Sequence, residues 1–438
     1  MKKATSTFFI LLASHTLLAK DFSLIGDIRE RFETLDGMNK KLYGDAASLI
    51  GEPDDRLIVS RIQLGFNYRF SSTAKLKVLG YYASVYGWSL GYDDFKKISG
   101  NEMYYMDPQE DFDFADLYIE AKKLFGISGL STKFGRQSNR YGDKRILGPG
   151  NWGNSYGWLW DLAKISYKFD DNFIDAFYGQ TKDKDKHCLS LFRKHVYEGI
   201  GIYSHFKTAQ NTALEPFVVY KNGLYTGSGN GQNTEKSYTF GLRVYNADLN
   251  GFNYDFTYAK ADGTIKTKNY DAYAYVAKVG YRFKNIKYKP NIVMGQIYAS
   301  GDDNPNDNTV KTFRTPFGGT DGSLYGRMDI MKWSNLIENI VELHLELMQT
   351  THVKLSFHDF SLADSHDQWV YYKKSNINGN NEDELGQEYD AELKWKYAEN
   401  LEFQAIYAYF DAGAFVTGNI LDNDAQRLFL QMHYSFKE

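Results

Sequence analysis

The stretch RLFLQMHYSF, residues 427–436, alternates strictly between two kinds of side chain. One face carries Leu428, Leu430, Met432, Tyr434 and Phe436, and the other carries Arg427, Phe429, Gln431, His433 and Ser435. A period of two residues is typical of a β-strand, and one wholly apolar face suits contact with lipid. The sequence therefore predicts a membrane-facing strand at this end of the chain.

The same alternation recurs along the whole chain, for example in residues 57–70 and 236–248. About 18 such segments can be counted, an even number within the range of single-chain outer-membrane barrels. They lie near residues 22–36, 57–70, 74–92, 113–124, 129–137, 158–169, 172–182, 197–207, 213–223, 236–248, 251–262, 271–284, 288–300, 335–349, 352–363, 387–398, 400–413 and 425–436. The prediction is an all-β fold, a transmembrane antiparallel up-and-down β-barrel with no helix needed.

The composition agrees with a barrel and excludes other classes. The chain has 35 Tyr and 30 Phe among 438 residues, yet its mean hydropathy is only -0.51. A barrel averages out as polar because its apolar residues occupy every second position. Beyond residue 19 no apolar run approaches the roughly 20 residues of a spanning helix. A net charge of -4 argues against a nucleic-acid partner, and the single Cys188 cannot form an internal disulfide.

The N-terminus has the features of a secretory signal. Lys2 and Lys3 precede an apolar run at residues 8–13, followed by Leu17, Leu18 and Ala19. A short apolar core behind a basic start is typical of a cleaved signal peptide. We predict a signal peptide over residues 1–19 and a single barrel domain over residues 20–438.

The connections between the segments alternate in length. Short ones include residues 71–73, 170–171, 248–251, 350–351 and 399–400, and the long ones are residues 37–56, 93–112, 138–157, 183–196, 301–334 and 364–386. This alternation predicts short periplasmic turns at one rim of the barrel and long extracellular loops at the other. A soluble two-sheet sandwich has no reason to alternate its loop lengths, so it is the weaker alternative.

Two motifs imitate ligand sites. Residues 148–153 spell G-x-G-x-x-G, but the next element is another alternating strand, so the helix that a dinucleotide site needs is missing. Asp302, Asn304 and Asn306 resemble the start of a calcium loop, but Asp307 replaces its glycine and Phe313 its final glutamate. We expect no cofactor and no metal site of the EF-hand kind, although acidic loops can hold calcium weakly.

Ser356 and His358 share one face of a predicted strand, and a serine with a histidine can hydrolyse lipid. Lys354 lies on the same face, which makes the pair lumenal, where phospholipid does not reach. No nucleophile elbow or firm third member accompanies them. We predict that the protein is not an enzyme and keep a barrel-anchored lipid hydrolase as a weaker alternative.

Charged residues are expected to point into the lumen, because Arg or Lys on the lipid face costs about 2–4 kcal/mol at the midplane. Alternation directs these residues inward: Arg29, Arg31, Arg61, Arg69, Arg136, Arg243, Lys278, Arg282 and Arg427, with the acidic Asp116, Glu120, Glu338, Glu342, Glu346, Asp390, Glu392 and Glu402. They predict either mutually paired charges that fill a wide barrel or a basic track facing an acidic wall, which would draw anions along one side.

One stretch, residues 135–158, carries a family resemblance. Gly135-Arg136-Gln137, Tyr141-Gly142-Asp143-Lys144-Arg145, Trp152 and Trp160-Asp161-Leu162 follow in order, and residues 298–305 and 386–393 add further matches. This pattern resembles the alginate export family of outer-membrane barrels. The resemblance implies an 18-stranded barrel that passes an anionic polysaccharide such as alginate. It also implies that Arg136 and Arg145 are pore arginines, that Asp161 holds one of them, and that Trp152 packs the constriction.

Two features complicate this transfer. Alternation from Ile165 and Tyr167 puts Asp161 on the lipid side, so an inward Asp161 requires a bulge near Ala163. The turn at Glu399-Asn400 is minimal where alginate exporters have a long plug, so the solute can be another anion. The sequence predicts a monomeric bacterial outer-membrane channel for an anionic sugar or a small anionic solute; a general diffusion porin or a surface-binding protein remains the alternative.

Overall fold

The computed structural model describes most of the chain. The described residues are 21–37, 55–87, 96–99, 102–105, 110–148, 153, 158–182, 195–223, 235–319, 324–377, 379–420 and 424–437. The expected signal peptide, Trp152 and Cys188 lie outside them.

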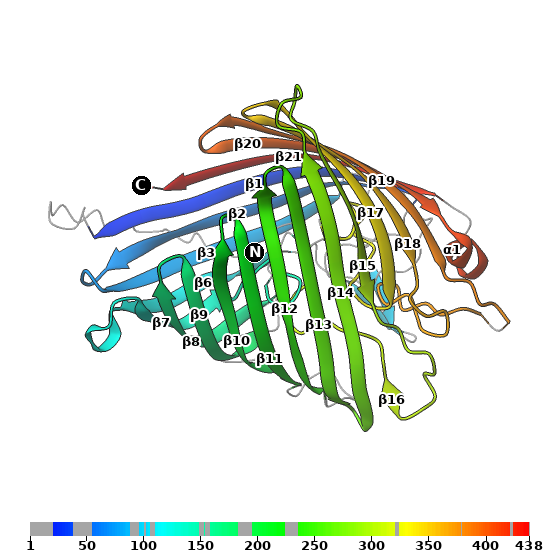
Figure 1. The fold of residues 1–438 in the computed structure, drawn as a ribbon, viewed down its shortest axis with the longest axis horizontal. Helices are drawn as coiled ribbons and strands as arrows, with labels where there is room; N and C mark the ends of the chain where they lie inside the picture. The colour runs from blue at the N-terminus through cyan, green and yellow to red at the C-terminus, as the bar shows by residue number, and fades with distance from the viewer. Residues whose placement is uncertain are drawn as a thin grey trace, which may run out of the picture.

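The fold is a closed antiparallel β-barrel of 18 strands, as predicted (Figure 1). The wall strands are β1 (Phe22–Asp36), β2 (Asp55–Arg69), β3 (Ala74–Gly87), β6 (Glu110–Lys122), β7 (Leu130–Ser138), β8 (Leu159–Phe169), β9 (Asn172–Lys182), β10 (His195–Ala209), β11 (Thr212–Gly223), β12 (Lys236–Leu249), β13 (Phe252–Ile265), β14 (Lys268–Arg282), β15 (Asn291–Ala299), β17 (Leu336–Met348), β18 (Thr351–Ser361), β19 (Glu384–Ala398), β20 (Leu401–Ala412) and β21 (Ala425–Lys437). The barrel closes because β1 pairs with β21 as well as with β2.

The two rims of the barrel differ. Both ends of the wall lie at one rim, since Ile25 of β1 pairs with Lys437 of β21. Turns such as residues 170–171 and 399–400 are at this short-turn rim, and the longer connections are at the other, the long-loop rim. One connection departs from the predicted pattern: residues 266–267 join β13 to β14 by a tight turn at the long-loop rim.

The two faces of the wall separate by alternation, as the sequence predicts. Outward positions are apolar and exposed, for example Leu64, Phe134 and Leu430. Inward positions are polar or small and buried, for example Arg61, Gln63 and Ala261. Burial on the inward face requires covering material inside the barrel, which the long loops supply.

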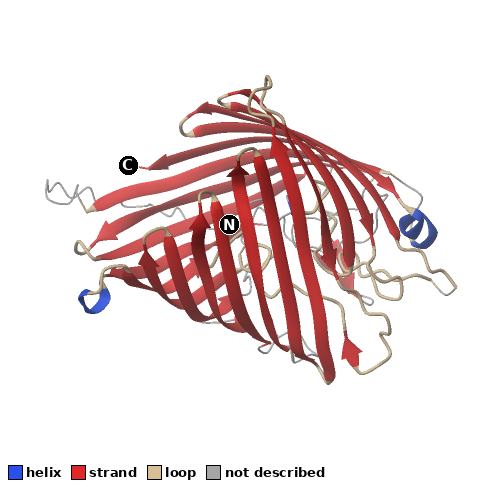
Figure 2. Cartoon of the chain, in the orientation of Figure 1, coloured by secondary structure: helices blue, strands red, loops and turns tan. Residues whose placement is uncertain are grey.

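Four short elements lie outside the wall. They are the β4–β5 hairpin (Lys96–Ser99 and Glu102–Tyr105), the 3-10 turn η2 (Leu124–Gly126), β16 (Thr309–Val310) and the helix α1 (Ala414–Asn419). Figure 2 shows the two helical segments at opposite rims. Both helical segments are connections, so the described wall is all β, as predicted. Among the described residues no helix is long and apolar enough to cross a membrane.

Candidate functional site

Two long connections, residues 138–157 and 301–334, meet inside the barrel. Leu147 bridges Phe317 in parallel, and the Gly148 amide donates to the Phe317 carbonyl at 2.9 Å. Both side chains are fully buried and pack with inward residues of the wall, among them Trp160 and Val59. The described parts of these two loops therefore narrow the lumen.

Two arginines of the wall hold the first loop. Arg29 of β1 and Arg61 of β2 are register partners, and both guanidinium groups donate to the carbonyl of Gly153, at 2.9 and 3.3 Å. Both residues are buried on the inward face, as predicted. The basic segment of the wall thus reaches the backbone of the inserted loop.

A second group of inward charges lies beside it. Arg31 donates to Glu33 at 2.6 Å, and Arg427 donates to the other oxygen of Glu33 at 2.9 Å. Arg427 also donates to the Met328 carbonyl at 2.8 Å, which fixes the second inserted loop. Arg31 and Arg427 are inward, as predicted, and Glu33 is a partner that the sequence analysis did not identify.

Residues of the second loop contact the acidic side chains of β19. Arg327 contacts Glu392 at 2.5 Å and its backbone amide donates to Asp390 at 3.1 Å. The Met328 amide donates to Glu388 at 2.7 Å. Gly326 permits this approach, because a Cβ atom there would lie 2.5 Å from the Glu388 carboxylate. Only β20 and β21 separate β19 from β1, so the acidic wall adjoins the basic one instead of facing it.

Ser356 and His358 are both buried on the inward face. His358 contacts two carboxylates, Glu338 at 2.8 Å and Asp390 at 3.3 Å. Within the described part of the chain, the Ser356 hydroxyl has no hydrogen-bond partner. Both ring nitrogens thus face carboxylates, and the Nδ1 atom makes the hydrogen bond to Glu338.

A cavity of about 430 Å³ opens in the lumen toward the short-turn rim. Its charged and histidine lining residues are Arg282, Lys289, Arg327, Lys354 and Lys394, His344 and His352, and Glu346 and Glu392. Five cationic residues against two carboxylates give this cavity a positive balance. Lys289 and Lys394 are more than half exposed, so their ammonium groups are available to a solute.

The remaining predicted charges divide between the lumen and the rim. Arg243 binds Asp255 through two hydrogen bonds of 2.9 and 2.6 Å. The other inward pairs are Lys278–Glu342, Arg282–Glu346, Lys77–Asp116 and Lys75–Glu120. Arg69 is exposed where β2 ends at the short-turn rim. Most predicted lumenal charges therefore have a carboxylate or ammonium partner.

Arg145 lies in the first inserted loop, away from the wall. Its guanidinium contacts Asp143 at 2.8 Å and packs over the Tyr325 ring at 4.8 Å. Although burial opposes the charge, Tyr325 and Asp143 raise the pKa of Arg145 above its ordinary value. Arg145 thus remains a cation that joins the two inserted loops.

Arg136 and Asp161 pair with each other, as the resemblance implies. The guanidinium makes two hydrogen bonds to the carboxylate, of 2.6 and 2.9 Å. The expected bulge near Ala163 is absent, however, because β8 pairs without a break with both neighbours. Asp161 keeps the face of Ile165, and Arg136 that of Phe134, which is the outward face. Their predicted inward position is therefore corrected.

Asp113 and Lys182, two residues without a sequence prediction, complete this ion cluster. Asp113 belongs to the inward face of β6, because its register partner is Tyr81, which pairs in turn with the inward Gln63. Arg136 also contacts Asp113 at 3.2 Å, and Lys182 binds the second Asp113 oxygen. The cluster lies where the pairing of β6 with β7 ends, at Leu117 and Arg136. Two cations and two carboxylates make it neutral overall.

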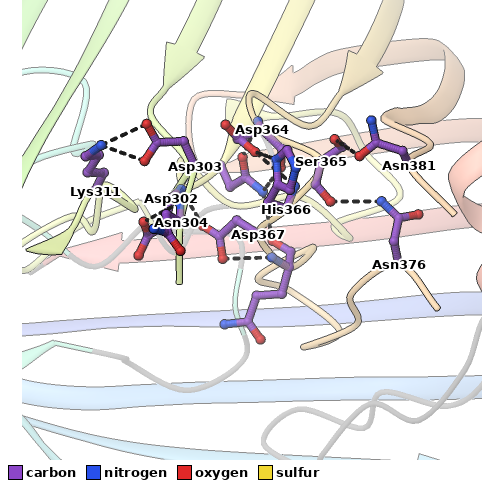
Figure 3. A network of polar contacts seen from close by, with 12 residues as sticks. Asp302, Asp303, Asn304, Lys311, Asp364, Ser365, His366, Asp367, Asn376 and Asn381 are labelled. Atoms are coloured by element: carbon purple, nitrogen blue, oxygen red, sulfur yellow. Dashed lines mark hydrogen bonds and ion pairs between the residues drawn. The ribbon is translucent and has the colours of Figure 1, made fainter. Parts of the chain in front are cut away.

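The stretch that imitates a calcium loop uses its carboxylates differently (Figure 3). Asp302 accepts the Asn304 amide at 3.3 Å, and Asp367 accepts the amide of Asp302 at 3.0 Å. Burial, with the nearby Asp367, raises the pKa of Asp302. These carboxylates cap the backbone of two neighbouring loops at the long-loop rim.

Solved structures of similar fold come from outer-membrane proteins. The chain superposes on Acinetobacter baumannii OccAB3 with a TM-score of 0.62 at 10% identity, over 96% of this chain and 100% of that one. Pseudomonas aeruginosa OpdQ gives 0.61 at 11% identity, over 97% and 100%. The Pseudomonas aeruginosa outer membrane protein opdK gives 0.60 at 10% identity, over 96% and 99%. At these identities the likeness establishes the fold.

No curated protein matches the chain. A family model does: the one described as alginate export matches residues 96–430. This span contains the ordered motifs that carry the resemblance and both loops that enter the lumen. The chain belongs to the alginate export family and is an outer-membrane β-barrel channel for solutes.

Proposed function

We propose that this channel is passive and selects anionic solutes, either small organic anions or an anionic sugar. The observation that carries the proposal is the lumenal cavity near the periplasmic rim, where five Lys or Arg residues accompany two Glu. Charged side chains that line a pore determine which ions enter it. Arginine and lysine can replace part of the hydration shell of a carboxylate by donating hydrogen bonds.

The distribution of carboxylates supports the same proposal. Glu388 and Asp390 accept the backbone amides of Met328 and Arg327, which reduces their influence on a passing solute, whereas Glu392 pairs with Arg327 in the wall of the cavity. Carboxylates that remain next to the cationic groups, such as Glu346, weaken their hold on an anion. Weak binding favours release, which a conducting channel requires.

Anion selectivity is expected to fall when the exposed cations of the cavity are neutralised. In planar bilayers under a salt gradient, the double variant Lys289→Gln and Lys394→Gln should shift the reversal potential toward the value of a cation-selective channel. Lys289 and Lys394 pair with Glu346 and Glu402, so the same change also removes the lysine partner of two carboxylates, of which Glu346 keeps Arg282. An electrostatic effect of this kind weakens as ionic strength rises.

Two controls accompany this measurement. Lys260→Gln removes a cation on the outward face, next to Asp271, and should leave the reversal potential unchanged. Glu346→Gln with Glu402→Gln should increase anion selectivity. A wild-type channel without charge selectivity would contradict the proposal and indicate a general diffusion porin. The many lumenal charges that pair with one another are the observation that favours this second candidate.

We also propose that the protein has no catalytic function. A serine nucleophile requires a base within hydrogen-bond reach, and His358 is directed to Glu338 and Asp390 instead. Ser356→Ala should leave conductance unchanged, and vesicle phospholipids should stay intact with either protein. Phospholipid hydrolysis that disappears in Ser356→Ala would establish the enzyme.

A further inference from the structure

The outward face of β6–β9 contains a depression that the channel function does not use. It has a volume of about 510 Å³ and is mostly apolar in lining. Leu76, Ile119, Phe134, Ala163 and Tyr178 form one continuous row of cross-strand partners along it. Phe134 is 71% exposed, Tyr178 is 50% exposed, and the small Ala163 lies between them. We call this feature the outer notch.

A second row of partners lies beside the outer notch, on its extracellular side. It runs Arg136, Asp161, Gln180, Glu198 and Asn222, each paired with the next across the strands. Glu198 accepts hydrogen bonds from Tyr178 at 2.8 Å and from Asn222 at 3.0 Å. On β7–β11 this polar row therefore lies on the extracellular side of apolar outward residues.

The order of the two rows matches one leaflet of the membrane. β7 runs toward the long-loop, extracellular rim, so Arg136 lies above Phe134, and Asp161 of the descending β8 lies above Ala163. A lipid of the outer leaflet has the same order, with its polar groups toward the exterior and its acyl chains below. An inner-leaflet lipid would place its headgroup at the wrong end of this site.

The ion cluster gives the site a chemical preference. The Asp161 side chain is 27% exposed, whereas that of Arg136 is 1% exposed, so the surface offered to lipid is a carboxylate. A carboxylate oxygen has more than one acceptor position and is therefore able to accept a further hydrogen bond. At the edge of the hydrocarbon, hydroxyl and amide groups of lipids are available donors, and their bond to a charged acceptor is strong.

We propose that the outer notch binds one outer-leaflet lipid that carries a hydrogen-bond donor. The acyl chain lies over Ala163, between Phe134 and Tyr178, and a hydroxyl or amide N–H of the same lipid donates to Asp161. The proposal is independent of the solute that the lumen carries.

The test is lipid binding to the purified full-length barrel by native mass spectrometry. Sphingomyelin and phosphatidylcholine share a headgroup, but only sphingomyelin has an amide and a hydroxyl next to its chains. The wild type should bind sphingomyelin more tightly. Ala163→Leu fills the outer notch and should weaken the binding about tenfold, the effect of losing the burial of about two methylene groups.

Ala176→Leu is the matched control, because Ala176 is exposed on the outward face of β9 and does not line the depression. It should bind sphingomyelin like the wild type. Heat-dependent gel migration verifies folding, and Phe134→Ala, which removes one side of the notch, replaces Ala163→Leu if that variant does not fold. Conductance should be unaltered in all of them. Equal binding of the two lipids by the wild type, or undiminished binding by the notch variant, would overturn the proposal.

Discussion

Replacing Arg327 by alanine is expected to detach the second inserted loop and enlarge the pore. The Arg327 guanidinium lies against Glu392 at 2.5 Å, and the side chains of both residues are largely buried. Removing one partner of such a pair costs about 3 kcal/mol or more, since the other charge stays buried. About 3 kcal/mol corresponds to more than a hundredfold shift in the equilibrium between the docked and detached loop.

The consequence is measurable in single channels. Conductance should rise, and selectivity should move toward cations, because Glu388, Asp390 and Glu392 lose their cover together. Arg314→Ala is the matched control: it removes an arginine of the same loop whose side chain is exposed. If Arg327→Ala conducts like the wild type, the loop does not limit the passage.

The barrel could be predicted from the sequence because its physical cause is local. Each strand alternates with a period of two, because lipid favours apolar residues at outward positions. A segment such as residues 427–436 can therefore be recognised as a strand from its own sequence. The signal is independent of how the strands pair. It accordingly predicted the strand number and the rim assignment, while the exact strand ends and the α1 segment depended on contacts that alternation does not encode.

The interior was less predictable, because the loops that fill it follow no period. Arg327 lies 65 residues from Glu392 in sequence, and no local sequence pattern predicts their contact. Lys289 and Lys394 likewise line one cavity because β15, β17, β18 and β19 pair side by side. A sequence signal that could have indicated this contact is charge complementarity: residues 324–334 include Arg327, and β19 carries Glu388, Asp390 and Glu392.

Arg136 and Asp161 show a different limit. Their pairing follows from the resemblance, but alternation placed Arg136 inward and Asp161 outward, and only its placement of Asp161 was right. The ion pair is tolerated here because its charges are compensated: Arg136 contacts both Asp161 and Asp113, and Lys182 binds Asp113. The alternation of a strand predicts which face a residue occupies, but it does not predict the partners that the residue contacts.

The second large effect is expected in stability: Arg136→Ala should destabilise the barrel by about 3–5 kcal/mol. The guanidinium is 1% exposed and contacts both Asp161 and Asp113, so its removal leaves Lys182 as the cation bound to Asp113, with Asp161 uncompensated. The midpoint of unfolding in urea, monitored on barrel reconstituted in vesicles, should fall accordingly. Conductance of the folded fraction should change little, because Arg136 and Asp161 line the outward depression and not the lumen.

A double variant separates charge balance from packing. Arg136→Met with Asp161→Leu removes one charge of each sign and keeps the pair between Lys182 and Asp113, so it should recover most of the stability lost in Arg136→Ala. Replacing a buried ion pair by apolar residues of similar volume is often neutral or stabilising. If the double variant is as unstable as Arg136→Ala, the geometry of the hydrogen bonds, and not the balance of charge, holds the seam between β6 and β7. If Arg136→Ala is as stable as the wild type, the cluster contributes nothing to the wall, and its role is confined to the lipid surface.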